Sequence, residues 1–465
     1  MFLGREKEIA ELEELYSSDK FEMIAIYGRR RVGKSSLIAH FIQNKSAIYF
    51  TAREADSARN IDIFSETLKV FSQSEDKLFF ESWEKVFEKI AKIAQNKKLV
   101  FVIDEYPYLA AADRSISSIL QKFCDNEFKN SNLMLILCGS SMSFMEEQVL
   151  GYQSPLYGRR TAQMKLLPFS YKDSALFVPN YSIFDKALVY GFGGGMPKYL
   201  ELFDDNLSLE KNVIKNFLTT TGYLYEEPTN LLKQELREHA KYNLIIEAIA
   251  NGASQMNTIS TKTRIETSAV SHYIKNLISL GIIKKEHCVT EEKNKKKSIY
   301  RIADTMFVFW YKYVFANEFS IISGDSESLY KNEITPDLNN FMGNIFEKMC
   351  FDYIAQKNAE NKFVFKIRNM GRWWGTNKNT KSQEEIDIIA INDKEKSIAF
   401  CECKFTNSLV DISILRDLQR KSQVFENYYK KKYFVLFSKN GFDKNLQEEA
   451  KKNEPVILVE LKDMF

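Results

Sequence analysis

Cysteine, histidine, proline and glycine are all scarce in this 465-residue chain. The six cysteines include no Cys-x-x-Cys pair, which argues against a disulfide framework and a tetrahedral zinc site. Four histidines leave little material for histidine-based metal or triad chemistry, and eight prolines with 18 glycines leave no room for a long flexible linker. No apolar run approaches the roughly 18 residues that span a bilayer, and the charged N-terminal segment is no signal peptide. We therefore expect a soluble cytoplasmic protein without a membrane segment.

The chain also lacks a strong excess of either charge. Its 65 Lys and Arg residues against 62 Asp and Glu residues give a net charge of +3, which neither requires nor excludes a nucleic-acid partner. The composition, 45% hydrophobic and 27% charged, is that of a globular protein. The length favours about three domains.

The first 170 residues alternate short apolar runs with helical stretches, which predicts a parallel sheet covered by helices. Each run is nearly continuous in apolar residues, as expected of strands that are buried on both faces. The expected strands are Glu22–Tyr27, Ala47–Thr51, Leu99–Ile103, Leu133–Cys138 and Gln163–Leu167.

A glycine-rich segment follows the first of these strands. Gly28-Arg-Arg-Arg-Val-Gly33-Lys34-Ser35 fits G-x-x-x-x-G-K-[ST] and precedes an expected helix over 35–43. In such a P-loop, backbone N–H groups surround phosphate oxygens, the lysine reaches the β- and γ-phosphates, and the hydroxyl binds Mg²⁺. The flanking strand and helix argue against a chance glycine turn. We predict ATP and Mg²⁺ as cofactors, bound by Gly28, Arg29, Arg30, Arg31, Val32, Gly33, Lys34, Ser35 and Ser36.

Two carboxylates end the expected strand at Leu99–Ile103. We predict that Asp104 joins Ser35 in holding Mg²⁺ and that Glu105 is the catalytic residue that polarises the attacking water. Gly139-Ser140-Ser141 ends a further strand, and its hydroxyls either sense the γ-phosphate or form a plain turn.

These motifs, in this order, resemble the AAA-type ATPases that are common in archaea and also found in bacteria, near the STAND and Orc-like ATPases. The resemblance covers the first 235 residues and includes the segments 2–6, 156–159 and 194–197. It implies that Phe2–Glu6 lies near the adenine and that Gly194–Pro197 begins a lid helix over the nucleotide. It also implies that Arg159 faces the phosphates, with Arg160 as the alternative and with surface charge as the plainer explanation of both.

Residues 241–303 show a different rhythm: two helical segments, a longer helix at 266–280 and a two-stranded hairpin. This is the layout of a winged helix-turn-helix, and we predict DNA as its partner. The exposed side chains of the recognition helix would be Ser271, His272, Lys275 and Asn276, and Lys293 with Lys295–Lys297 would reach phosphates from the wing. The alternatives are a module that only packs domains together and a solvated lysine turn.

After an expected aromatic packing helix at 307–315, the last 130 residues show strand-like runs at 362–367, 385–391, 397–404, 433–437 and 455–460 with a helix at 411–429. They also carry a second pattern of carboxylates. Glu385-Ile-Asp387 is followed after fourteen residues by Glu402-Cys-Lys404, and strand alternation places Glu402 and Lys404 on one face, with Cys401 and Cys403 on the other. Carboxylates that converge at a cleft bind Mg²⁺, which activates water and stabilises charge on a phosphate. We predict Asp387 and Glu402 as metal ligands, Lys404 as the catalytic cation, and Glu347 as a further catalytic residue aimed at the same cleft.

This pattern resembles the PD-(D/E)XK nuclease-like domains, with Ile386 in place of the proline that gives them their name. The expected loop Gly371-Arg-Trp-Trp-Gly375 belongs to the resemblance. The alternatives are a nuclease fold that only binds and a hairpin with a surface ion pair between Glu402 and Lys404.

Together the patterns predict an α/β protein in four segments: a P-loop ATPase core at 1–168, a helical lid at 169–238, a winged helix at 239–318 and a nuclease-like domain at 330–465. The expected function is an ATPase that couples nucleotide state to DNA binding and metal-dependent DNA cleavage. The alternative is a STAND-like switch with an inactive nuclease fold. A homo-oligomer is a further possible partner state, since an arginine supplied in trans would require one.

Overall fold

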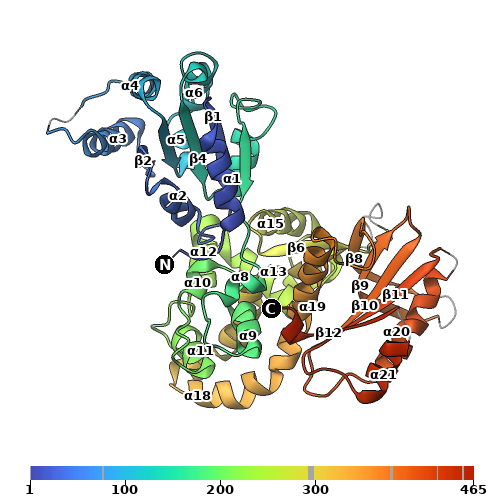
Figure 1. Ribbon diagram of the computed structural model, residues 1–465. Coiled ribbons are helices and arrows are strands. Elements are labelled where there is room, and N and C mark those ends of the chain that lie inside the picture. The colour runs from blue at the N-terminus through green and yellow to red at the C-terminus, as the bar shows by residue number, and fades with distance from the viewer. Residues whose placement is uncertain (1, 76–77, 292–297, 378–380, 427, 453–454) are drawn as a thin grey trace. The chain divides into compact units, whose positions relative to one another are not determined.

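A computed structural model of the chain describes residues 2–75, 78–291, 298–377, 381–426, 428–452 and 455–465. The chain forms two compact units (Figure 1). The first unit comprises residues 1–168 together with the short segment 196–198, and the second comprises the remainder. Each unit is described by itself below.

The first unit is a five-stranded parallel sheet with helices on both faces (Figure 1). The strand order is β2-β3-β4-β1-β5, so β1 and β3 flank β4 and all carboxyl ends meet at one edge. Every residue of β1, β3 and β4 is buried, as the near-continuous apolar runs predicted. The strands are β1 (Glu22–Tyr27), β2 (Ala47–Thr51), β3 (Leu99–Asp104), β4 (Leu133–Gly139) and β5 (Ala162–Lys165).

The helices of the first unit cover the sheet with amphipathic faces. In α4 the buried residues recur at helical spacing, from Trp83 through Val86, Phe87 and Ile90 to Ala94. They pack with Phe50, Phe64 and Phe101 into an aromatic-rich core. The helices are α1 (Glu6–Ser17), α2 (Lys34–Ile42), α3 (Ser57–Ser72), α4 (Trp83–Asn96), α5 (Tyr106–Ala112), α6 (Ile116–Asp125) and α7 (Met142–Phe144).

The second unit begins with helices that lead into a three-helix group and a hairpin. The group consists of α13 (His239–Ala250), α14 (Met256–Thr263) and α15 (Thr267–Ser279), and antiparallel strands β6 (Ile283–His287) and β7 (Ser298–Ile302) follow it. This is the predicted element order. The preceding helices are α8 (Tyr171–Ala175), α9 (Ile183–Gly193), α10 (Pro197–Leu200), α11 (Leu209–Phe217) and α12 (Glu227–Glu235).

Short helices lead from the hairpin to a 25-residue helix, α19 (Thr335–Ala359). They are α16 (Thr305–Phe309), α17 (Glu318–Ile322) and α18 (Ser326–Leu329), with π-helical turns at Trp310–Val314 and Tyr330–Ile334. Trp310 is buried, and its indole N–H donates to the carbonyl of Tyr225 at 2.6 Å. The expected aromatic packing helix at 307–315 is therefore divided among three helical types.

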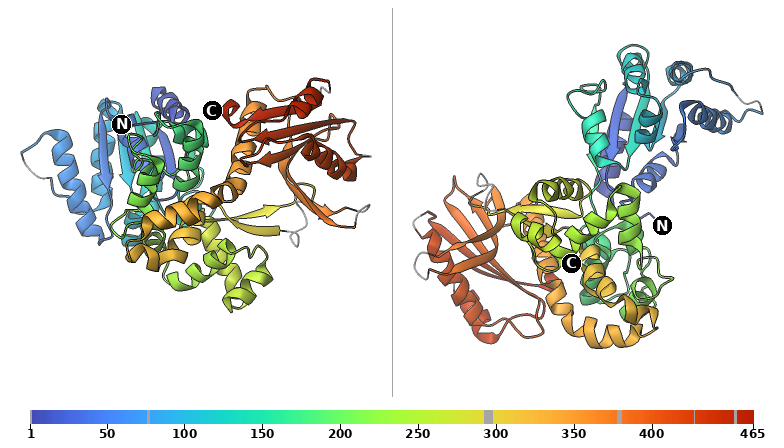
Figure 2. Two further views of the ribbon diagram at one scale, coloured as in Figure 1. Left: turned by 90° about the horizontal axis from the view of Figure 1, so that it is seen from below. Right: turned by 180° about the vertical axis from the view of Figure 1, so that it is seen from behind.

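A mixed five-stranded sheet, orange to red in Figure 2, completes the second unit. Its strand order is β12-β11-β10-β9-β8. Its strands and helices are β8 (Asn369–Thr376), β9 (Gln383–Asn392), β10 (Ser397–Lys404), α20 (Ile412–Ser422), β11 (Lys431–Ser438), α21 (Lys444–Lys452) and β12 (Val456–Glu460). Apolar side chains of α20 and α21 cover one face, where Phe400, Leu418 and Leu446 share a core. On the other face, Tyr353 of α19 packs against Phe437.

Three expectations for this domain were wrong. The segment 362–367 is not a strand, because the side chain of Asn358 bonds the backbone of Ile367 and holds the segment as an irregular turn after α19. The segment 371–375 is not a loop but lies within strand β8. The expected helix over 411–429 ends at Ser422, and a 3₁₀ turn follows it.

None of the helices in the described part of the chain combines the length and the apolar character that crossing a bilayer requires.

Candidate functional site

The glycine-rich segment lies between β1 and α2 at the carboxyl edge of the parallel sheet. Gly33 precedes α2 with φ +90°, a conformation that favours glycine. Gly28 lies so close to β5 that an added Cβ would stand 2.5 Å from the carbonyl oxygen of Leu166. The two glycines therefore let the backbone turn into the N-terminus of α2, which is the geometry of an anion-binding loop.

Lys34 points back into this loop. Its ammonium donates to the carbonyl oxygens of Gly28 at 2.9 Å and Arg29 at 3.1 Å. The side chain is buried, and burial lowers the pKa of Lys34. The cation is therefore held inside the loop, where the motif predicts the β- and γ-phosphates of a nucleotide.

Ser35 and Asp104 meet beside the loop. The Ser35 hydroxyl donates to Asp104 Oδ2 at 3.0 Å, and the Tyr49 hydroxyl donates to the same oxygen at 2.5 Å. Burial, reinforced by the Asp104 charge, raises the pKa of Tyr49. A hydroxyl and a carboxylate are the oxygen ligands that Mg²⁺ prefers, so these two residues fit the predicted metal. Sequence reasoning missed Tyr49, because its contact with Asp104 depends on β2 lying next to β3.

Glu105 occupies a strained position at the end of β3. Its φ is +53°, in the left-handed region that is unfavourable for a non-glycine residue. Its Oε2 accepts hydrogen bonds from the Ser140 hydroxyl at 2.9 Å and the Ser140 N–H at 3.2 Å. The segment after β4 therefore orients the carboxylate of Glu105.

The N-terminal segment also contacts the loop. Arg5 donates to the carbonyl oxygens of Val32 at 3.1 Å and Leu167 at 2.7 Å. Phe2 stacks on His40 of α2, with ring centroids 4.2 Å apart and an interplanar angle of 9°. The segment 2–6 therefore lies beside the P-loop and α2, where the resemblance places the adenine.

The remaining residues of the loop contribute in different ways. Arg29 is buried, and Arg30 donates to the Tyr108 hydroxyl at 3.0 Å. Arg31 has φ +69°, and Ser36 lies exposed in the first turn of α2. Pro197, at the start of α10, lies 3.5 Å from where a Cβ on Gly33 would stand. The segment expected to begin the lid therefore packs on the P-loop.

Arg159 is not brought to the loop. Its guanidinium pairs with Asp125 at 3.0 Å, and Thr161, two residues later, bonds Met23 at the start of β1. Gly28 follows the other end of β1, five residues on, or about 16 Å at 3.3 Å per residue. Within one chain, Arg159 therefore lies at the opposite edge of the sheet from the phosphate loop. Arg160 does not face the phosphates either, since it donates to the carbonyl of Leu150.

In the second unit, Asp387 and Glu402 lie at the point where β9 and β10 stop pairing, which is called the sheet fork below. Strands β9 and β10 pair as far as Ile388 and Cys401, and Asp387 comes next along β9. Its Oδ2 accepts the Cys403 N–H at 2.8 Å. Burial and the nearby Glu402 charge raise the pKa of Asp387 to about 6. Two carboxylates that disfavour each other's charge fit a divalent cation.

Two lysines surround Glu402. Lys404 lies 2.7 Å from its Oε1, and Lys421 of α20 lies 3.5 Å from its Oε2. This second oxygen is buried and accepts no hydrogen bond from the described residues. The ion pair between Glu402 and Lys404, given above as the alternative to a metal site, is present, but Glu402 is buried and the pair is not a surface one. Phe400 packs in the core beneath α20, as expected from the alternation of side chains along β10. No sequence motif pointed to Lys421, because it lies on α20, which a loop separates from β10.

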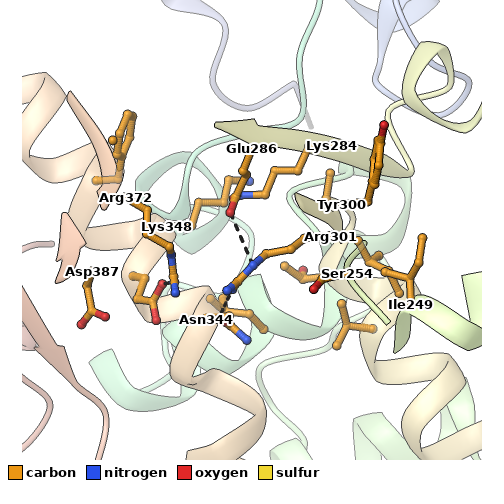
Figure 3. A pocket seen from close by; sticks show the side chains of 18 of the residues that line it. Ile249, Ser254, Lys284, Glu286, Tyr300, Arg301, Asn344, Lys348, Arg372 and Asp387 are labelled. Carbon is orange, nitrogen blue, oxygen red and sulfur yellow. Dashed lines mark hydrogen bonds and ion pairs between the residues drawn. The ribbon is translucent and has the colours of Figure 1, made fainter. Parts of the chain in front are cut away.

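Glu347 does not join this pair. It forms an ion pair with Arg372 of β8, which also lies 3.4 Å from Glu385. Among the residues that the structure describes, no three acidic, histidine or cysteine side chains are grouped as a metal site. Glu347 and Asp387 do share a cavity, which is lined by side chains of the hairpin, α19, β8 and β9 (Figure 3).

The face predicted for DNA recognition on α15 is partly as expected. Ser271, His272 and Lys275 are exposed. Asn276 is half-buried instead and donates to the Tyr242 hydroxyl at 2.6 Å. The predicted wing residues Lys293 and Lys295–Lys297 lie outside the described residues.

Comparison with known proteins supports the ATPase motifs of the first unit and finds a relative that aligns with the whole chain. Residues 2–203 match the model of an ATPase domain predominantly from Archaea, and residues 310–432 match a family described as archaeal and bacterial proteins of unknown function. The protein MJECL04 of Methanocaldococcus jannaschii is 34% identical over 467 residues, covering 100% of both chains.

Two solved structures are similar at lower identity. The Walker-type ATPase PABY2304 of Pyrococcus abyssi is 21% identical with a TM-score of 0.53, covering 67% of this chain and 96% of that one. The ORC2 protein of Aeropyrum pernix is 12% identical with a TM-score of 0.47, covering 69% and 95%. The P-loop geometry and the similarity to PABY2304 support a P-loop ATPase fold, and by its identity to MJECL04 over the full length the chain belongs to the same protein family, with an archaeal-type ATPase domain at its N-terminal end.

Proposed function

We propose that this protein binds and hydrolyses ATP and couples the nucleotide state to DNA binding and metal-dependent DNA cleavage. The observation that carries the ATPase part is the meeting of Lys34, Ser35 and Asp104 around one loop. Lys34 would bind the phosphates, and Ser35 with Asp104 would hold Mg²⁺. That ion would neutralise charge that builds on the phosphates.

Glu105 is proposed to take the proton of the attacking water. Ser140 orients its carboxylate through two hydrogen bonds, and the left-handed backbone places it at the first turn of α5. A base held by a fixed neighbour is ready to act without rearrangement. Any action of Arg159 on a nucleotide is proposed to occur in trans, because within one chain it lies at the far edge of the sheet.

Glu105→Gln is expected to bind ATP as the wild type does and to hydrolyse it about 10²–10⁴-fold more slowly, the range for loss of a general base. The amide oxygen of glutamine still accepts from Ser140, so the loop should keep its geometry. Single-turnover hydrolysis with a parallel binding titration measures both effects. Turnover at the wild-type rate would remove Glu105 from the mechanism.

For the second unit, we propose a winged helix followed by a PD-(D/E)XK-like nuclease domain. The three-helix group and its hairpin have the element order of a winged helix. Asp387, Glu402 and Lys404 at the sheet fork support the nuclease-like domain. Asp387 and Glu402 would hold Mg²⁺ or Mn²⁺, which would supply an activated water and stabilise charge on the phosphate. Lys404 would steady the charge that develops during cleavage.

One observation favours the alternative of a binding switch without cleavage. Arg372 holds Glu347, and the fork therefore has two carboxylates and not three. Cleavage of DNA in Mg²⁺ or Mn²⁺ by the wild type decides between the two functions.

Replacing Lys293, Lys295, Lys296 and Lys297 with alanine is expected to weaken DNA binding across all sequences. Each lysine that contacts a phosphate contributes about 0.9 to the slope of log affinity against log salt, so the slope should fall by up to that amount per lysine. Anisotropy titrations at several salt concentrations measure it. The control removes Lys451 and Lys452, exposed on α21. An equal loss of affinity in the control, or no loss in either variant, would show that the wing lysines do not contact DNA phosphates.

A further inference from the structure

A cavity of about 810 Å³ lies within the second unit, apart from the ATP site (Figure 3). Its walls come from five places in the sequence: the end of α13 with the turn after it, the hairpin β6–β7, the start of α16, the middle of α19, and the pair β8–β9. Ser254 lies on the first wall, Lys284 and Arg301 on the second, Asn344 on the fourth, and Asp387 on the fifth.

The walls of the cavity are fixed to one another. Arg301 bridges the hairpin to α19, donating to Asn344 at 2.6 Å and lying 3.4 Å from Glu286. Beyond β6, the Val289 N–H donates to the carbonyl of Arg372 at 3.0 Å, and Val289 is buried in the core of the C-terminal sheet. The hairpin and the sheet that carries Asp387 therefore form one preformed site.

The lining contains both hydrogen-bond donors and acceptors. The basic side chains are Lys284, Arg301, Lys348 and Arg372, and the acidic ones are Glu286, Glu347, Asp352, Glu385 and Asp387. A groove that tracks a phosphate backbone is uniformly positive, which this cavity is not. The edges of unpaired bases carry donors and acceptors side by side, and the aromatic residues Tyr300, Phe341 and Phe351 add apolar surface.

The volume of the cavity limits the size of the ligand that it can hold. The volume falls within the range of about 300–1,000 Å³ for sites that enclose a small molecule. Such a site accepts single nucleotides, whereas the stacked pairs of a duplex stay outside it. In a duplex, the base edges that pair are already occupied, so a site of this chemistry reads only a strand that is unpaired.

We propose that this cavity receives unpaired bases of a nucleic-acid strand and so directs a single-stranded end or flap toward Asp387. The proposal rests on the proposed function, because it names the substrate class of the site that contains Asp387. The hairpin would contact the adjoining duplex, and the unpaired nucleotides would enter the cavity beside the pair formed by Arg301 and Asn344.

The test compares the affinity of the full-length protein for a blunt DNA duplex and for the same duplex with a five-nucleotide overhang, by fluorescence anisotropy without metal. The overhang should raise affinity at least tenfold, and this gain should change little with salt, because base contacts release few counterions. Asn344→Trp fills the cavity from an exposed position on α19 without changing a charge, and it should remove the gain. Ser254→Trp plugs the cavity from the opposite wall and should act in the same way.

The matched control is Asn340→Trp, also exposed on α19 but one turn away and outside the cavity lining. It should keep the full overhang gain. Equal affinity for the two duplexes, or a gain that survives both plugs, overturns the inference while the DNA-binding function stands. Absence of any DNA binding overturns the DNA part of the proposed function, and this inference with it. An overhang gain without metal-dependent cleavage would support the cavity and remove the nuclease.

Discussion

Lys34→Ala is expected to lower the affinity for ATP by about 10- to 100-fold, the equivalent of one hydrogen bond to a charged group at about 1.5–3 kcal/mol. The reason is geometric: Lys34 lies inside the loop and bonds its carbonyl oxygens, so no other side chain takes its place. Isothermal titration with ATP and Mg²⁺ measures the change. Steady-state hydrolysis should fall at least as far, because the phosphates lose their cation as charge builds up.

Lys92→Ala is the control, since Lys92 is exposed on α4 and takes no part in the loop. It should bind ATP with the wild-type affinity. A thermal melt of Lys34→Ala separates loss of binding from loss of folding, because the variant leaves two buried carbonyl oxygens short of a donor. Wild-type affinity and turnover in a folded Lys34→Ala would remove the P-loop assignment.

Asp387→Ala is expected to abolish metal-dependent DNA cleavage. Loss of an outer partner of a metal ligand already costs about 10–100-fold, and Asp387 is proposed as a ligand itself. The backbone N–H of Cys403 would also lose its acceptor. Plasmid nicking in Mg²⁺ and Mn²⁺ measures activity, and Mn²⁺ binding followed by electron paramagnetic resonance gives a readout independent of cleavage.

The control is Asp393→Ala, an exposed carboxylate on the turn after β9 whose partner is the Tyr429 hydroxyl. It should cleave and bind Mn²⁺ as the wild type does. Cleavage that persists in Asp387→Ala would place the activity elsewhere or in a contaminant.

The first unit was predictable from the sequence to within a few residues. Strands β1, β3 and β4 are buried on both faces, so each is a short apolar run that ends where the polar site begins, as β3 does at Asp104 and Glu105. Strand β5 begins one residue and ends two residues before the expected strand, and β3 and β4 each extend one residue further than expected. The contacts between strands were not predictable, because the apolar pattern of one strand does not show which strands lie beside it. Tyr49 on Asp104 and Ser140 on Glu105 both depend on it.

The C-terminal domain was harder to predict because its boundary elements are polar or irregular. In β8, Gly371 and Gly375 flank two tryptophans, a composition typical of a loop, yet the strand pairs with β9 across a register shift. In α21 only Leu446 is buried, so no apolar stripe marked the helix. Missing β8 also hid Arg372, and with it the ion pair that holds Glu347 away from the fork.

The most direct test of the account measures DNA cleavage in Mg²⁺ or Mn²⁺, with and without ATP, by the wild type, Lys34→Ala and Asp387→Ala. The account predicts that the wild type cleaves at a rate that changes with ATP. Lys34→Ala should cleave at a rate that ATP does not change, and Asp387→Ala should not cleave. Cleavage by the wild type that is indifferent to ATP would contradict the coupling, and the absence of cleavage under every condition would contradict the nuclease.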